Sequence, residues 1–163
     1  MASTYSTTLG IEKMGAGDQS GTWGTTTNYN WNILDRIIGY KAVTLSSTSE
    51  TLTIREASPT DGASHLTDGM YRILNFGDAG DLGGTVTVTF STSTTNTYFV
   101  VRNGLSASRS IIFSQGTGAT TFTLPNGKTA LIYCDGSDEV HNALKDLYVE
   151  TLQTTGAATL GST

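Results

Sequence analysis

Short stretches in which apolar and hydroxyl-bearing residues alternate run through the middle of this chain, and they limit its fold more than any other feature. The clearest is Thr85–Phe90, where Val86, Val88 and Phe90 share one face and threonines occupy the other. Side chains on a strand alternate between its two faces, so this pattern predicts a strand with one buried face. Of the 163 residues, 30 are Thr, 16 are Ser and 19 are Gly, a composition that favours strands over helices.

Further segments with strand-like patterns flank this one, and turn signals separate them. The segments are Val43–Leu45, Leu52–Ile54, Tyr71–Phe76, Thr97–Arg102, Ser110–Ser114, Thr121–Leu124 and Ala130–Cys134. The turn signals are Asp61-Gly62, Gly83-Gly84, Asn103-Gly104, Asn126-Gly127 and Asp135-Gly136. The continuous apolar runs at 97–102 and 110–114 predict strands buried on both faces. Seven or eight short strands at this spacing predict a mainly β fold, an antiparallel β-sandwich or jelly roll, over residues 41–134.

A short amphipathic helix is expected before the strands. Its span is Asn28–Ile38, and its apolar positions are Trp31, Ile33, Leu34, Ile37 and Ile38. Thr27 or Asn28 would cap its start, and Gly39 would form a left-handed cap at its end. A helix this short is not stable alone in water, so its apolar face must dock on its own β domain, a second copy or another protein.

The residues before the helix have no sustained period and contain five glycines, which predicts an irregular arm. Residues 1–40 therefore form an arm and a docking helix. Trp23 lies between glycines in Ser20–Gly24 and is expected to fill a pocket, either in its own domain or in a partner. The candidate partner-binding residues are Trp23, Trp31, Ile33 and Ile37. An arm of this makeup should order against a partner, leaving the β domain as spacer and trimer core.

Residues 135–163 differ from the β domain in their sequence pattern. Ser137 is expected to cap a helical turn over Ser137–Asp146. The pattern T-L-x-[ST]-T then occurs at 151–155 and again at 159–163, with Leu152 and Leu160 at equivalent places. Short repeats of this kind need neighbours to bury their apolar edge. We expect a linker followed by an extended segment that starts a trimeric fibre shaft, and a chain that is the N-terminal piece of a longer fibrous protein.

Composition excludes several classes of function. With 9 basic and 14 acidic residues, a net charge of -5, the chain does not suit nucleic-acid binding. No stretch approaches the roughly 20 apolar residues that a membrane-spanning helix needs, so no membrane insertion is expected. The single cysteine excludes a disulfide scaffold and fits folding in a reducing cytoplasm.

Motifs for catalysis or for metal binding are missing from the sequence. It contains no Walker-type phosphate loop, no His-Glu-x-x-His and no G-x-S-x-G elbow. We expect His65 in a surface loop, His141 in a linker and Cys134 as a buried inert thiol. The segment Asp78–Asp81 is interpreted as a Gly-rich turn, because it lacks the full ligand set of a calcium loop. The expectation is therefore no enzymatic activity, no metal and no cofactor, although two carboxylates paired by the fold for glycoside hydrolysis stay an alternative.

Several motifs together resemble a known family. They are Tyr5 with Leu9–Lys13, Gly21–Asn28 (GTWGTTTN), Gly80–Thr85, Val101–Ile111 and Leu124–Lys128. In these motifs the chain is similar to the N-terminal region of tail-fibre-like structural proteins of bacteriophages, especially phages of marine bacteria and cyanobacteria. GTWGTTTN is the most specific of them, and the others are general β-turn chemistry.

The resemblance implies a virion component assembled in the host cytoplasm. It implies a homotrimeric tail fibre whose N-terminal domain binds phage tail proteins, such as an adaptor, nozzle or baseplate protein, while a distal part absent from this sequence recognises the host. No long shaft fits within 163 residues. Alternatives are a head-decoration or other tail accessory protein, and a carbohydrate-binding receptor module or glycan hydrolase. A carbohydrate-binding module would show exposed aromatic side chains on the β domain, and a hydrolase would show close carboxylates in a cleft.

Overall fold

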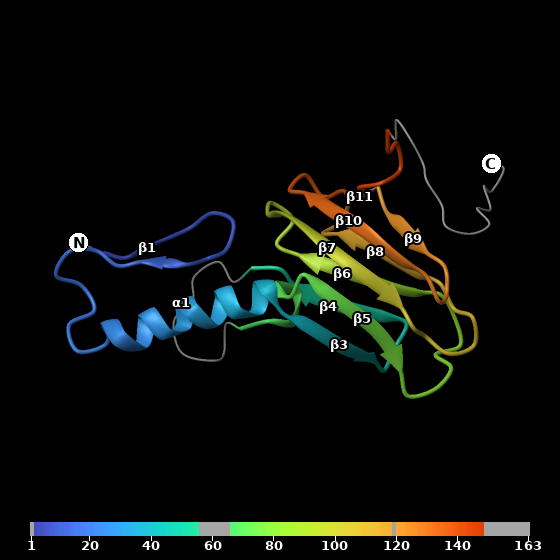
Figure 1. Ribbon diagram of the computed structural model, residues 1–163, viewed down its shortest axis with the longest axis horizontal. Helices are drawn as coiled ribbons and strands as arrows, with labels where there is room; N and C mark the ends of the chain where they lie inside the picture. The colour runs from blue at the N-terminus through green and yellow to red at the C-terminus, as the bar shows by residue number, and fades with distance from the viewer. Residues whose placement is uncertain (1, 56–65, 119, 149–163) are drawn as a thin grey trace, which may run out of the picture.

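Two facing β-sheets form the main body of the protein in a computed structural model, which describes residues 2–55, 66–118 and 120–148 (Figure 1). The five-stranded sheet has the order β11-β10-β7-β5-β3, and the four-stranded sheet has the order β4-β6-β8-β9. The first consists of β3 (Tyr40–Leu45), β5 (Ile73–Asp78), β7 (Asn96–Asn103), β10 (Thr129–Asp135) and β11 (Val140–Asn142). The second consists of β4 (Ser49–Thr53), β6 (Val86–Ser91), β8 (Ile111–Gln115) and β9 (Phe122–Leu124). The expected mainly β sandwich is thereby confirmed.

The strands from β3 to β8 alternate between the two sheets along the chain. Each connection crosses from one sheet to the other. Neighbouring strands of one sheet are therefore two apart in the chain and run in the same direction. The pairs β3–β5, β5–β7, β4–β6 and β6–β8 are accordingly parallel. Within the two sheets, antiparallel pairing is confined to β7–β10, β10–β11 and β8–β9. The expectation of an antiparallel sandwich is wrong for the parallel pairs, because a half-buried strand alternates with period two whichever way its neighbour runs.

Phenylalanine rings join the two sheets at the centre of the core. The rings of Phe90 on β6 and Phe99 on β7 stack with centroids 4.3 Å apart, and Phe76 on β5 lies 5.5 Å from Phe113 on β8. Val86, Val88 and Phe90 are fully buried, as their alternation predicts.

The strand β7 differs from its expected burial on both faces. Phe99, Val101 and Asn103 point into the core, whereas Tyr98 is exposed. The sequence suggested burial on both faces because an apolar or aromatic residue also occupies the outward face of this strand.

The helix α1 (Trp23–Ile38) begins five residues earlier than expected. Thr22 precedes it without a side-chain capping bond, so the capping role assigned to Thr27 or Asn28 is wrong. Gly39 is extended (φ -89°, ψ 171°) and not left-handed. Gly39 gives the ring of Tyr71 room, because a Cβ there would lie 3.1 Å from that ring, closer than an ordinary van der Waals contact.

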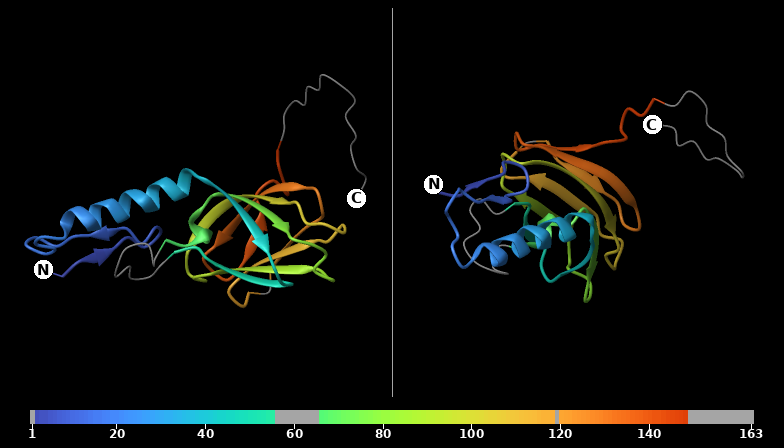
Figure 2. Two further views of the ribbon diagram at one scale, coloured as in Figure 1. Left: turned by 90° about the horizontal axis from the view of Figure 1, so that it is seen from below. Right: turned by 60° about the vertical axis from the view of Figure 1, so that its left-hand side comes forward.

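The N-terminal arm is more regular than expected. It contains an antiparallel pair of short strands, β1 (Thr4–Tyr5) and β2 (Glu12–Lys13), that runs beside α1 beyond one end of the sandwich (Figure 2). The side-chain amide of Asn30 accepts a hydrogen bond from the Glu12 N–H (3.0 Å) and donates one to the Glu12 carbonyl (2.9 Å). The arm is thus ordered by the helix of its own chain.

The five-stranded sheet extends beyond residue 134. The helical turn expected over Ser137–Asp146 is wrong, because Asp135–Glu139 forms a turn into β11, which pairs with β10. Gly136 has φ 80°, a conformation that favours glycine in such a turn. The proposed shaft residues Leu152 and Leu160 lie outside the described residues.

Candidate functional site

One side of α1 carries apolar side chains that the described part of the chain leaves exposed, fully or in part. Trp31 is 62% exposed, Leu34 37% and Ile38 82%. They follow one another at helical spacing, and a shallow groove runs between them, lined also by Asn32, Asp35 and Ile37. Trp23, at the first residue of the helix, is exposed as well. We call Trp31, Leu34 and Ile38 the outer face of α1.

The opposite side of α1 faces its own chain. Thr26 and Ile33 are buried on the same side as Asn30, which binds the arm. Ile33 is 1% exposed, so its assignment as a partner-binding residue is wrong. Ile37 is half-buried and borders the groove with its outer edge. The apolar stripe expected from the sequence is therefore split between an inward and an outward side.

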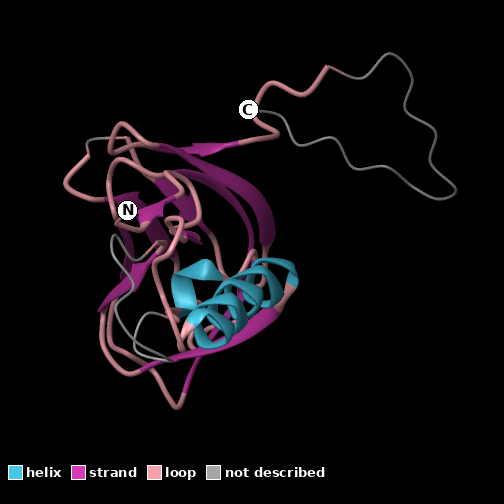
Figure 3. Ribbon diagram, turned by 90° about the vertical axis from the view of Figure 1, so that its left-hand side faces the viewer, coloured by secondary structure: helices cyan, strands magenta, loops and turns pink. Residues whose placement is uncertain are grey.

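Arg36 fixes the end of the helix against the sandwich. Its Nη1 donates to the Thr67 carbonyl (3.0 Å) and lies 3.5 Å from Asp68 Oδ1. Its guanidinium also sits over the ring of Tyr71, 5.2 Å from the centroid. Because α1 continues into β3 through Gly39, the helix projects from one end of the sandwich (Figure 1), and Figure 3 views the molecule from that end.

A second group of exposed aromatic side chains lies on the five-stranded sheet. Tyr98 on β7 and Tyr133 on β10 are directly opposite each other in register, and both are exposed. Their neighbours Phe99 and Cys134 point into the core, so the two tyrosines share the outer face of the sheet. A shallow groove beside them is bordered by Arg72 and by Thr8 of the arm.

The carboxylates of the expected Gly-rich turn hold neighbouring loops together. Arg109 donates to both oxygens of Asp81 (2.9 Å each), and the Gly83 N–H donates to Asp81 Oδ1. These bonds, that from Arg109 above all, lower the pKa of Asp81 to about 2. Asp78 accepts a hydrogen bond from the Ser106 N–H. Both carboxylates thus connect this turn to the loop after β7.

Cys134 is a buried thiol, as expected. It is 1% exposed at the inner face of β10. Burial raises its pKa to about 12, which keeps the thiol protonated and its reactivity low.

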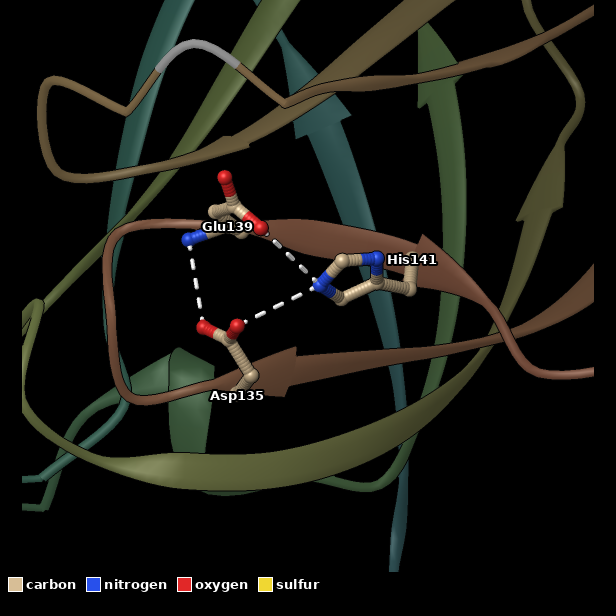
Figure 4. Close-up of side chains that lie close together, drawn as sticks. All are labelled: Asp135, Glu139 and His141. Atoms are coloured by element: carbon tan, nitrogen blue, oxygen red, sulfur yellow. Dashed lines mark hydrogen bonds and ion pairs between the residues drawn. The ribbon is translucent and has the colours of Figure 1, made fainter.

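His141 lies in a strand and not in a linker, and two carboxylates meet its ring (Figure 4). Asp135 ends β10, Glu139 precedes β11, and one ligand atom from each of the three residues lies within 4.8 Å of the others. The Ser137 N–H is the main cause that lowers the pKa of Asp135. The cluster was not predicted from the sequence, although the pattern D-x-x-x-E-x-H across a glycine turn is a local signal for it. His65 lies outside the described residues.

The chain was also compared with known proteins. No family model, curated protein or solved structure matches it. Among the described residues, no helix has the length and apolar character to cross a membrane. What the fold defines is a class: a mainly β, two-layer sandwich with one projecting helix.

Proposed function

We propose that this protein is a structural component of a phage virion, the N-terminal attachment domain of a tail fibre, which holds the fibre to the tail through protein–protein contact. A resemblance in sequence, and the place of its main motif in the fold, support the proposal. The motif Gly21–Asn28 and the shorter motifs resemble tail-fibre-like proteins, and that motif forms the start of α1. On this proposal the chain is not an enzyme, and host recognition belongs to a distal part.

The observation that carries the proposal is the outer face of α1. Trp31 and Ile38 are more than half exposed on a helix that stands away from the sandwich. Tryptophan is enriched among the residues that dominate binding energy at protein interfaces. A projecting helix with an apolar outer face suits insertion into a groove of a tail protein. The attachment residues are therefore Trp31, Leu34 and Ile38, with Trp23 at the helix start.

The same proposal includes a homotrimer, because three linked helices would bind a symmetric tail with much higher avidity than one. Sedimentation equilibrium of the purified chain is expected to give three times the chain mass of 17.2 kDa. A monomer at micromolar and at millimolar concentration alike would contradict the trimer, while leaving attachment through α1 open to its own test.

Carbohydrate binding is a second candidate, favoured by one observation. Tyr98 and Tyr133 present adjacent exposed rings on the outer face of the five-stranded sheet. Two adjacent exposed rings can stack on the apolar faces of sugars. Exposed aromatic side chains on the β domain are the feature expected of a carbohydrate-binding module.

Immunogold electron microscopy of purified phage particles tests the proposed function. Antibody against the sandwich is expected to label the tail and not the head. Labelling of the head would point to a decoration protein and contradict the proposal. Absence from particles, together with glycan-array binding that Tyr98→Ala abolishes, would replace it by the carbohydrate-binding alternative.

A further inference from the structure

The hairpin formed by β10 and β11 brings one imidazole and two carboxylates to the same side of a sheet. Cys134 and Val140 pair in register and are both buried, so their neighbours Asp135, Glu139 and His141 lie on the outward side. The Asp135 N–H donates to the Glu139 carbonyl, which places these two residues opposite each other. The cluster is thus built by strand register and not by a flexible loop alone.

The distances within this cluster are long for hydrogen bonds. His141 Nε2 lies 3.3 Å from Asp135 Oδ2 and 3.4 Å from Glu139 Oε2. Charge-assisted N–H···O bonds are usually about 2.7–2.9 Å, and a single ring nitrogen carries at most one hydrogen to share between two acceptors. The single Nε2–H can therefore make a short, well-aligned hydrogen bond to only one of the two carboxylates.

The same distances suit ligands around one metal ion. Zinc binds imidazole nitrogen and carboxylate oxygen at about 2.0–2.2 Å, so two ligand atoms at tetrahedral positions are roughly 3.4 Å apart. The two measured N···O separations match that value. A set of one imidazole and two carboxylates suits a borderline transition-metal ion, whereas calcium takes six to eight oxygen ligands and magnesium prefers water and oxygen.

Groups outside the three side chains hold each of them in place. Asp135 Oδ1 accepts the Ser137 N–H (2.7 Å), which leaves Oδ2 facing His141. Glu139 Oε1 accepts the hydroxyl hydrogen of Thr120 (2.9 Å), which leaves Oε2 free to face the same ring. The His141 ring stacks on Tyr133 with centroids 4.9 Å apart. Supporting contacts of this kind orient the ligands of metal sites in proteins.

We propose that Asp135, Glu139 and His141 bind a divalent transition-metal ion of the zinc type, with one coordination position left for water. The ion neutralises two adjacent carboxylates and ties the edge strand β11 to β10. This inference is independent of the proposed attachment function, and it replaces the expectation from sequence that the chain has no metal site.

The test is calorimetric titration of the full, untagged chain, stripped with a chelator, with zinc chloride. We expect one zinc ion per chain, and four-coordinate visible absorption when cobalt(II) is used instead. His141→Ala and Asp135→Asn should each weaken zinc binding at least ~100-fold, because loss of a supporting group alone typically costs 10–100-fold. Thr120→Val, which removes such a group, should weaken zinc binding about tenfold.

Two control variants separate this site from unspecific zinc binding. His65→Ala removes the other histidine of the chain, and Asp146→Asn removes a nearby carboxylate outside the cluster; both should bind zinc as the unmodified chain does. If circular dichroism shows that His141→Ala is unfolded, zinc binding by Asp135→Asn alone tests the site. No zinc uptake at millimolar concentration, unchanged binding in Asp135→Asn, or loss of binding in His65→Ala would overturn the proposal.

Discussion

Replacing Trp31 and Ile38 together by serine is expected to lower the amount of this protein in purified phage particles at least tenfold. Both side chains are more than half exposed, so the sandwich should fold unchanged, within about 0.5 kcal/mol. An interface anchor contributes roughly 2 kcal/mol or more, and each 1.4 kcal/mol is about a factor of ten in affinity. Quantitative mass spectrometry of particles, scaled to a major capsid peptide, measures the effect.

The matched control is Tyr98→Ser, which removes an exposed aromatic side chain from the sandwich and leaves α1 intact. It should incorporate at the normal level. Normal incorporation of the Trp31/Ile38 double variant would move attachment away from the outer face of α1, and loss of incorporation in Tyr98→Ser would move it to the five-stranded sheet.

Phe113→Ala is expected to lower the free energy of unfolding by roughly 3–5 kcal/mol. Phe113 is fully buried, and its ring lies between those of Phe76 on the opposite sheet and Phe90 on the neighbouring strand. Removing it opens a cavity where the two layers meet. Because domains are stable by only about 5–15 kcal/mol, a large part of the stability depends on this one ring.

Urea unfolding followed by circular dichroism measures that loss, and Tyr98→Ala serves as the surface control. The control should change the free energy of unfolding by less than about 1 kcal/mol. A loss below about 1 kcal/mol for Phe113→Ala would mean that the two sheets do not share the phenylalanine core described here.

The strands could be predicted from the sequence, but their arrangement could not. The alternation at Thr85–Phe90 locates β6 and identifies its buried face, because one-sided burial leaves a period of two. Whether the next strand joins the same sheet or crosses to the other depends on the connections, which have no such pattern. The parallel pairs β3–β5 and β4–β6 were missed for that reason.

The start of α1 was missed because its first turn is built from poor helix formers. Gly24 and the threonines that follow it favour other conformations. Contacts distant in sequence override this preference: Thr26 donates to the Gln19 side chain, and Asn30 binds the backbone of Glu12. Such tertiary bonds leave no local signal.

Exposure separates the candidate residues that a partner could reach from the one that is buried. Trp23 and Trp31 were identified from sequence and are accessible, whereas Ile33 has the same apolar character and is buried. Helical period gives the spacing of an apolar stripe, but it does not say which edge of a wide stripe the rest of the chain covers. The cluster at His141 depends on the register of β10 and β11, which the local pattern D-x-x-x-E-x-H indicates but does not determine.

Photo-crosslinking inside intact particles tests attachment through α1 most directly. A photoreactive amino acid is placed at Ile38 on the outer face, or at Tyr98 on the sandwich as the control. Ile38 is expected to form crosslinks to a tail protein in assembled particles, and Tyr98 is expected to form none to the tail. Crosslinks to the tail from Tyr98 alone, or from neither position in particles that contain the protein, would contradict attachment through α1.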